Sequence, residues 1–289
     1  KLGDVMKYTV LSLEQECYPK ALQQISNPPQ NLYALGNLSL LSSNSILAIV
    51  GSRDCTEYGR NQAFRFAKEL SQNHYTIISG LAIGIDSSAH IGALQGEGNT
   101  IAVLGSGFSH IYPEENIWLF HQILQKGGCI LSEYPPDTEV SMKNFPKRNR
   151  IISGIAHGVL VVEAGFRSGS TITARQARDL QKNIFCLPSN ITSKNSMGTH
   201  ILIRQGAELV FSPSQIIEKM KSIPTTSPPT PFIPENYQAV YHLLLSGPLS
   251  INQIAKSLSL NLPQLQSLLT MMELDGFVEQ LPGNEFKRK

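Results

Sequence analysis

Positive charge is concentrated in residues 143–150, which read KNFPKRNR. Phe145 lies within this stretch, and no carboxylate does. Cations at this density can neutralise phosphate groups, and an aromatic face can stack on a nucleic-acid base. A short charged run is more often only a solvated surface, so neighbouring motifs must support the interpretation. The four cations are Lys143, Lys147, Arg148 and Arg150.

Turns rich in glycine and serine follow three apolar runs that have the character of strands. They are residues 51–53 (GSR), residues 79–90 (SGLAIGIDSSAH) and residues 168–171 (SGST). The free backbone N–H groups and the dipole of a helix start make such a turn an anion site. A single turn of this kind usually only connects a strand to a helix. Three of them beside the cation cluster indicate a surface for several phosphates in a row.

The apolar segment after the cations supports the same interpretation. Residues 151–158 (IISGIAHG) predict a helix that begins directly after Arg150. Positive charge at a helix N-terminus opposes the helix dipole and costs a few tenths of a kcal/mol or more per residue. We therefore expect a negatively charged ligand at this point.

Other polar residues have structural explanations that are at least as good as catalytic ones. Asp86 and His90 have the i, i+4 spacing of metal ligands, but without a third ligand a helix cap and a satisfied core histidine are favoured. Glu133 and Glu163 each follow a predicted strand, where they could act as acid and base or could hold loop N–H groups. The sequence lacks a G-x-x-x-x-G-K-[ST] loop, and residues 105–110 (GSGFSH) lack the third glycine of a dinucleotide-binding motif. We predict no catalytic residues, no metal and no cofactor.

The elements that position these motifs alternate regularly from Ser45 onward. Residues 45–52 (SILAIVGS) form a continuous apolar run, and residues 59–73 have apolar side chains at helical spacing. Similar pairs recur up to residue 222. Strands that are apolar at every position are buried on both faces. The pattern predicts an α/β, Rossmann-like fold with a mainly parallel sheet, in which ligands bind at the carboxyl ends of the strands.

The sequence divides into four predicted parts. Residues 1–44 form a short helical and turn-rich lead-in, and residues 45–222 form the Rossmann-like domain. Residues 223–234 form a proline-rich linker, because five prolines lie between positions 223 and 236. Residues 235–289 have the pattern of a small winged-helix domain, with two helices around a tight turn and then a hairpin.

The charges of the predicted winged-helix domain argue against recognition of double-stranded DNA. Its second helix, expected at residues 262–276, contains no lysine or arginine, and from Glu235 onward four basic residues face five acidic ones, a net charge of −1. A helix that reads a major groove normally supplies cations. A protein-interaction or stabilising role is therefore favoured, and a transcription regulator is disfavoured.

Bulk properties predict a cytoplasmic protein without a membrane segment. The formal net charge is only +2, so a nucleic-acid partner would have to be met by local clustering. The four cysteines are far apart in the sequence, and no two of them form a C-x-x-C motif. This distribution is typical of reduced thiols inside cells. No apolar run approaches the roughly 20 residues that span a bilayer.

Ordered motifs between Tyr18 and Met220 resemble the bacterial DNA-processing protein family DprA (Smf). The quoted blocks are IVGSR, SGLAIGIDSSAH, TIAVLGSG, LSEYPP, NFPKRNRIISG, VVEAGFRSGSTITA and GTHILIRQGA. This resemblance implies an extended Rossmann domain that binds single-stranded DNA without cutting it. It also implies protection of incoming DNA in natural transformation, loading of RecA recombinase onto that DNA, and a homodimer. The tail resembles the optional winged-helix domain of the family, while a further helical N-terminal domain that many members carry is expected to be absent or removed.

The resemblance and the cation cluster together define the predicted DNA-binding residues. The family motifs GSR, NFPKRNR and SGST supply most of them, and Lys143 belongs to the same charged run. The full set is Ser52, Arg53, Lys143, Phe145, Lys147, Arg148, Asn149, Arg150, Ser168, Gly169, Ser170 and Thr171.

One departure and one alternative remain open. The family usually has Pro-Gly after its sixth strand, whereas this chain has Pro188-Ser189-Asn190.

The alternative function is a nucleotide-binding or nucleotide-hydrolysing enzyme that uses the glycine turns and Glu163. A single nucleotide needs one or two cations, whereas the cluster with Arg53 and Arg167 could follow several phosphates, which favours DNA.

Overall fold

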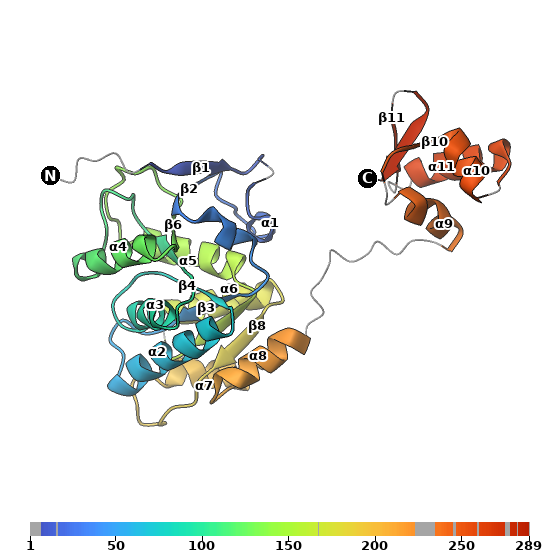
Figure 1. Cartoon of the computed structure of the whole chain (residues 1–289). Helices are drawn as coiled ribbons and strands as arrows, with labels where there is room; N and C mark the ends of the chain where they lie inside the picture. Colours follow the sequence, from blue (N-terminus) through green and yellow to red (C-terminus); the bar gives the residue numbers. More distant parts are fainter. Residues whose placement is uncertain are drawn as a thin grey trace. The chain divides into compact units, whose positions relative to one another are not determined.

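The structure, a computed structural model, forms two compact units, Lys1–Ile223 and Pro224–Lys289 (Figure 1). It describes residues 7–15, 17–166, 168–222, 235–244, 247–258, 260–274, 278–281 and 283–288. The predicted linker at 223–234 and the side chain of Arg167 lie outside these residues.

The described part of the first unit contains a nine-stranded sheet in the order β1-β2-β6-β5-β4-β3-β7-β8-β9. From β6 to β9 all neighbouring strands are parallel. Every residue of β3 to β7 is buried, as expected for strands covered on both faces. The predicted Rossmann-like, mainly parallel sheet is confirmed. Its parallel strands are β3 (Ile46–Val50), β4 (Thr76–Ser79), β5 (Thr100–Leu104), β6 (Cys129–Ser132), β7 (Gly158–Val161), β8 (Asn183–Cys186) and β9 (Glu208–Leu209).

Helices cover both faces of the sheet (Figure 1). One core cluster joins apolar residues of α5, α6 and α7 to the sheet, and a second joins those of α2, α3 and α8. A third cluster packs α4 against β5 and β6. Besides the 3-10 helix η2 (Glu114–Asn116), the seven described α-helices that follow β3 in this unit are α2 (Glu57–Gln72), α3 (Ile85–Gln95), α4 (Ile117–Gln125), α5 (Asn144–Ile155), α6 (Gly169–Asp179), α7 (Met197–Arg204) and α8 (Pro213–Ser222).

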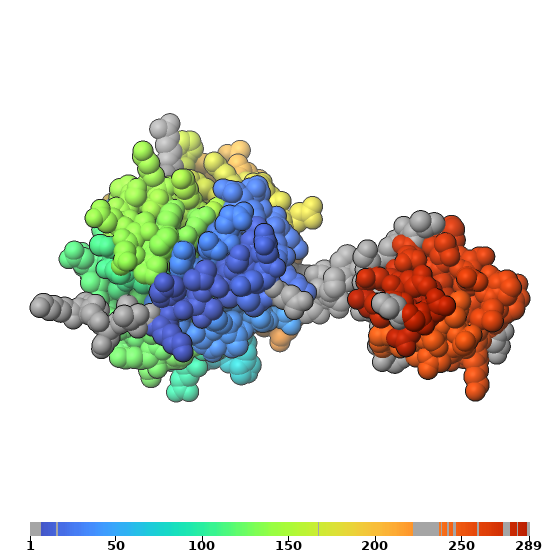
Figure 2. Space-filling model, turned by 90° about the horizontal axis from the view of Figure 1, so that it is seen from above, coloured from blue at the N-terminus to red at the C-terminus, as the bar shows by residue number. Residues whose placement is uncertain are grey.

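The N-terminal lead-in contains two strands that the sequence pattern did not predict. Besides α1 (Lys20–Gln23) and the 3-10 helix η1 (Leu38–Ser42), it forms β1 (Thr9–Ser12) and β2 (Asn31–Gly36). β2 pairs antiparallel with β6, and β1 pairs antiparallel with β2, so the sheet is mixed at this edge. These strands were missed because they are short and only partly alternating in burial. In Figure 2 the dark blue N-terminal segment lies on the surface of this unit.

The second unit has the predicted winged-helix arrangement. β12 pairs with both β10 and β11, and the buried side chains of α9, α10, α11 and the hairpin form a separate core. Its elements are α9 (Glu235–Leu243), β10 (Leu249–Ser250), α10 (Ile251–Leu258), α11 (Leu262–Leu274), β11 (Val278–Leu281) and β12 (Glu285–Arg288). Within the described residues of both units, no helix is long and apolar enough to cross a membrane.

Candidate functional site

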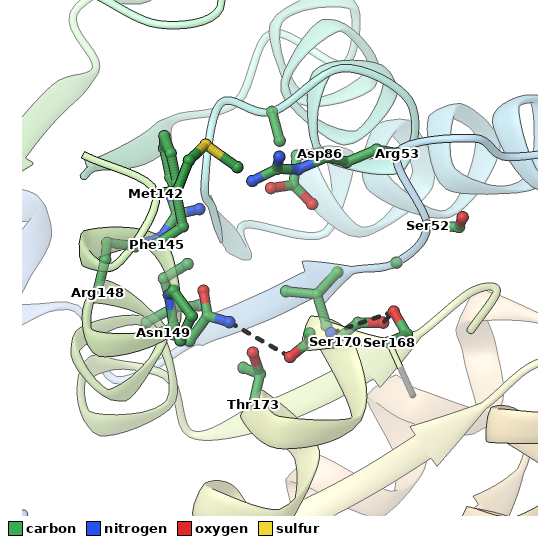
Figure 3. Close-up of a pocket in the computed structure, with 16 residues that line it drawn as sticks. Ser52, Arg53, Asp86, Met142, Phe145, Arg148, Asn149, Ser168, Ser170 and Thr173 are labelled. Carbon is green, nitrogen blue, oxygen red and sulfur yellow. Dashed lines mark hydrogen bonds between the residues drawn. The ribbon is translucent and has the colours of Figure 1, made fainter. Parts of the chain in front are cut away.

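A pocket of about 300 Å³ opens at the carboxyl ends of the parallel strands (Figure 3). Four segments line it: the loop after β3, the β4–α3 turn with the start of α3, Met142 with α5 as far as Ile152, and the start of α6. α6 follows β7, which is the direct neighbour of β3 in the sheet. Loops that follow adjacent parallel strands meet at one edge, so segments far apart in the sequence form one site.

Most of the predicted DNA-binding residues line this pocket. They are Ser52, Arg53, Phe145, Arg148, Asn149, Ser168, Gly169 and Ser170. The remaining four belong to the same segments but do not line it, namely Lys143, Lys147, Arg150 and Thr171. A role of all twelve in DNA binding stays a prediction.

The start of α6 has the features of an anion site. The Ser168 hydroxyl oxygen accepts a hydrogen bond from the Ser170 N–H at 3.3 Å, and Ser168 is the N-cap. The Thr171 hydroxyl donates to the Ser168 carbonyl at 2.7 Å. The Asn149 side-chain amide donates to the Gly169 carbonyl at 3.3 Å and so ties α5 to α6 (Figure 3). The α6 N-terminus thus presents its dipole to the pocket without an acidic residue in its first turn.

The helix that carries the cations begins earlier than predicted. α5 starts at Asn144, so Arg148 and Arg150 lie inside it and the expected start after Arg150 is wrong. Pro146 lies in the first turn, where a missing N–H leaves no helical hydrogen bond unmade. The N-cap position is occupied by Lys143, so a cation does face the helix dipole, two turns upstream of the predicted point.

Arg148 is buried and holds strand ends together. Its side chain is only 4% exposed, and its Nη1 donates to the carbonyls of Gly80, at 2.6 Å, and Val103. A Cβ on Gly80 would overlap that nitrogen, so the guanidinium occupies the space of a side chain. Burial lowers the pKa of Arg148 to about 10, and burial also raises the pKa of the neighbouring Asp86. Arg148 lines the pocket but is primarily part of the core.

The other cations divide into one pair and three exposed side chains. Arg150 forms a salt bridge with Glu133, and both side chains are largely buried. Arg53, Lys143 and Lys147 are exposed. The uncompensated charge inferred from the sequence is therefore supplied by these three residues, which we call the exposed cations.

The aromatic ring expected to stack on a base is already covered. Phe145 is 9% exposed; the Arg53 guanidinium carbon lies 4.9 Å from its ring centroid, and Tyr112 packs against it at 5.6 Å between centroids. A base could reach this face only after Arg53 moved. Met142 lines the same pocket and is 64% exposed, which offers open apolar surface. No sequence pattern pointed to Met142, because a single methionine before a charged run carries no periodicity.

The polar residues considered for catalysis have structural partners. The buried Glu163 carboxylate accepts from the Thr56 N–H at 2.9 Å and from the Thr56 hydroxyl, so it holds this loop, which is one of the two roles that the sequence left open. Asp86 accepts from the Gly80 N–H at 3.2 Å, but the N-cap of α3 is Gly84, so the predicted cap position is wrong. In the described part of the chain, no group of three or more potential ligands could hold a metal ion.

His90 is a core histidine, as the sequence pattern favoured, although only one of its nitrogens is bonded. Its Nδ1 lies 2.7 Å from the Thr100 hydroxyl oxygen, and that hydroxyl donates to the Ile77 carbonyl at 2.8 Å. Nδ1 must therefore carry the proton that bridges to Thr100. Nε2 is buried without a partner among the described residues. Burial lowers the pKa of His90 to about 3, which keeps the ring neutral.

We expect His90 to make the protein acid-sensitive. Between pH 6.5 and about 3 the unfolded chain binds a proton that the folded protein excludes, so stability falls as the pH falls through this window. The expected loss is about 1.4 kcal/mol per pH unit. Urea unfolding at pH 7 and pH 4.5 measures it. His90→Gln should show a shallower pH dependence than the wild type, and equal slopes would contradict the assignment.

Comparisons with known proteins agree with this architecture. The family model described as DNA recombination-mediator protein A matches residues 9–221, and the model described as DprA winged helix domain matches residues 224–284. Protein Smf of Escherichia coli (strain K12) is 38% identical over 285 residues, which cover 95% of this chain and 76% of that protein.

Two solved structures are similar to about three quarters of this chain. DNA processing protein A (DprA) from Streptococcus pneumoniae has a TM-score of 0.70 and 40% identity, and the match covers 74% of each chain. DNA processing protein A from Helicobacter pylori, reported for its unique single-stranded DNA binding mode, has a TM-score of 0.68 and 32% identity. That match covers 75% of this chain and 97% of the Helicobacter chain.

Proposed function

Because the chain belongs to the DNA recombination-mediator protein A family, we propose that it binds single-stranded DNA in natural transformation. The observation that carries the proposal is the pocket where the exposed Arg53 and the α6 N-terminus meet. The similarity to the Helicobacter pylori protein, which is reported to bind single-stranded DNA, supports it. Cations and a helix start recognise phosphates and not base edges, so binding is nearly independent of sequence.

The charge distribution favours a strand over a single nucleotide. The exposed cations Arg53, Lys143 and Lys147 extend along the loop after β3 and the first turns of α5, and the α6 N-terminus adds a further anion site. Together they suit successive phosphates of one backbone.

A hydrolytic function is disfavoured because its candidate carboxylates are engaged. Glu133 is paired with Arg150, and Glu163 accepts two hydrogen bonds from Thr56. We therefore propose a non-catalytic protein that needs no cofactor, in place of the nucleotide-hydrolysing alternative.

Family membership also supports a proposal for the wider biological role. We propose that the protein protects incoming DNA, loads RecA recombinase onto it, and acts as a homodimer in the cytoplasm. The family description as a recombination mediator supports this role. The winged-helix domain is proposed to bind protein or stabilise the assembly, since α11 contains no lysine or arginine.

Fluorescence anisotropy with a labelled thymidine oligomer tests the proposal. We expect the single strand to bind more tightly than a duplex of equal length, and a thymidine mononucleotide to compete poorly. With about three phosphates neutralised, the slope of log K against log salt concentration should be near −2. Equal weak binding of strand and duplex, or efficient competition by the mononucleotide, would contradict single-strand binding.

A further inference from the structure

A second pocket lies beside the first at the carboxyl edge of the sheet. Its volume is about 580 Å³, within the roughly 300–1,000 Å³ typical of small-molecule sites. One loop connects the two pockets: Gly51, Ser52 and Arg53 line the first, and Thr56 lines the second. We call it the Tyr58 pocket; its lining residues are Thr56, Tyr58, Glu163, Pro188, Ser189, Asn190 and Ser193.

The chemistry of the Tyr58 pocket differs from that of the first pocket. None of its lining residues is a lysine, arginine or histidine, and the Glu163 carboxylate is among them. Such a lining repels phosphate. Tyr58 is 45% exposed, and its hydroxyl donates to the Pro188 carbonyl at 3.1 Å, which fixes the position of the ring. A positioned aromatic ring beside a proline suits a flat, uncharged ring system.

Two polar groups in this pocket have unused hydrogen-bonding capacity. Each Glu163 oxygen accepts one hydrogen bond from Thr56, and each carboxylate oxygen has two acceptor sites. The Ser189 hydroxyl oxygen is buried and has no partner among the described residues. The Glu163 carboxylate can only accept, so a ligand that meets it should present N–H donors, whereas the Ser189 hydroxyl can accept or donate. Among the uncharged bases, guanine places two adjacent donors, its ring N1–H and its 2-amino group, on one edge, whereas thymine has one N–H between two carbonyls.

We infer that the Tyr58 pocket receives a guanine base from the strand whose phosphates bind at the first pocket. This inference rests on the proposed single-strand binding. It adds a preference at one nucleotide to binding that is otherwise independent of sequence. The Ser189-Asn190 departure from the Pro-Gly of the family motif supplies part of this pocket, since both residues line it.

The test compares two oligomers of equal length, one of thymidine only and one with a single central guanine. A strand can slide along sequence-independent phosphate contacts, so the guanine can reach the pocket. We expect the guanine strand to bind about ten-fold more tightly, in the range of one good bidentate base contact. Tyr58→Ala removes the aromatic ring, and Ser189→Leu fills part of the pocket. Each variant should bring the ratio of the two affinities close to one. Replacing guanine with hypoxanthine, which lacks the 2-amino group, should lower the ratio.

Matched controls separate this inference from the proposed function. Tyr8 is 41% exposed and lies outside the pocket, so Tyr8→Ala should keep the ten-fold ratio. Arg53→Ala should weaken both strands by the same factor. A wild-type ratio of one, or a ten-fold ratio that survives both pocket variants, would overturn the guanine site while single-strand binding stands. Failure of the wild type to bind either strand would overturn both.

Discussion

Replacing Arg148 with methionine should lower the free energy of unfolding by about 3–5 kcal/mol, although Arg148 belongs to the cation cluster assigned to phosphates. The substitution leaves Asp86 buried without the charge that faces it. The two groups interact, because the charge of Arg148 lowers the pKa of Asp86 and the charge of Asp86 raises the pKa of Arg148. It also removes the donor to the Gly80 and Val103 carbonyls. Unpaired buried groups carry the full cost of their desolvation.

Urea denaturation followed by circular dichroism measures this loss. The matched control is Lys147→Met, one position away in α5, because Lys147 is exposed and should change stability by no more than about 0.5 kcal/mol. If both variants were equally stable, the buried hydrogen bonds of Arg148 would not stabilise the fold. A loss of DNA binding in an Arg148 variant therefore has to be corrected for the unfolded fraction before it is assigned to a lost phosphate contact.

Removing the three exposed cations together should weaken single-strand binding on the order of 100-fold at low salt, because each neutralised phosphate contributes to counterion release. In the Arg53→Ala/Lys143→Ala/Lys147→Ala variant, the salt slope should flatten from about −2 towards zero. The free energy of unfolding should change little, since all three side chains are exposed. Anisotropy titrations at several salt concentrations measure the affinity and its salt slope.

An equal change in net charge elsewhere provides the control. Lys20, Lys126 and Arg204 are exposed and do not line the first pocket, so their triple alanine variant should retain most of the affinity. If the two triple variants lost affinity equally, only the overall charge would matter, and the pocket would not be the binding site.

The parallel sheet and the edge that carries the site were predictable from local patterns. Runs such as residues 45–52 are apolar at every position because both faces of β3 are covered, and that burial is visible in the sequence. The family resemblance from the motifs is confirmed by the matching family models. β1 and β2 were not predictable, because β2 pairs with the distant β6 and β1 pairs with β2, and strands of four to six residues do not encode such contacts.

Which of the cations are buried, paired or exposed was harder to predict, although the spacing of apolar residues carries some information. Arg148 precedes Ile151, Ile152 and Ile155 by three, four and seven positions, which places it on the buried face of α5. That spacing becomes informative only once the helix is known to begin at Asn144. Charge alone does not distinguish Arg148 from its exposed neighbour Lys147, and the partner of Arg150 is seventeen residues away in the sequence.

The close fit between Gly80 and the Arg148 guanidinium restricts the order in which this site can evolve. Any side chain at Gly80 would overlap the guanidinium, so a mutation there is harmful while Arg148 is present. A mutation of Arg148 alone leaves Asp86 uncompensated. Neither position can drift freely, and a lineage that abandons this arrangement has to lose the arginine before it can gain a side chain at position 80. An observable consequence would be that substitutions at position 80 are tolerated only in backgrounds where the arginine and the acidic partner have already been replaced.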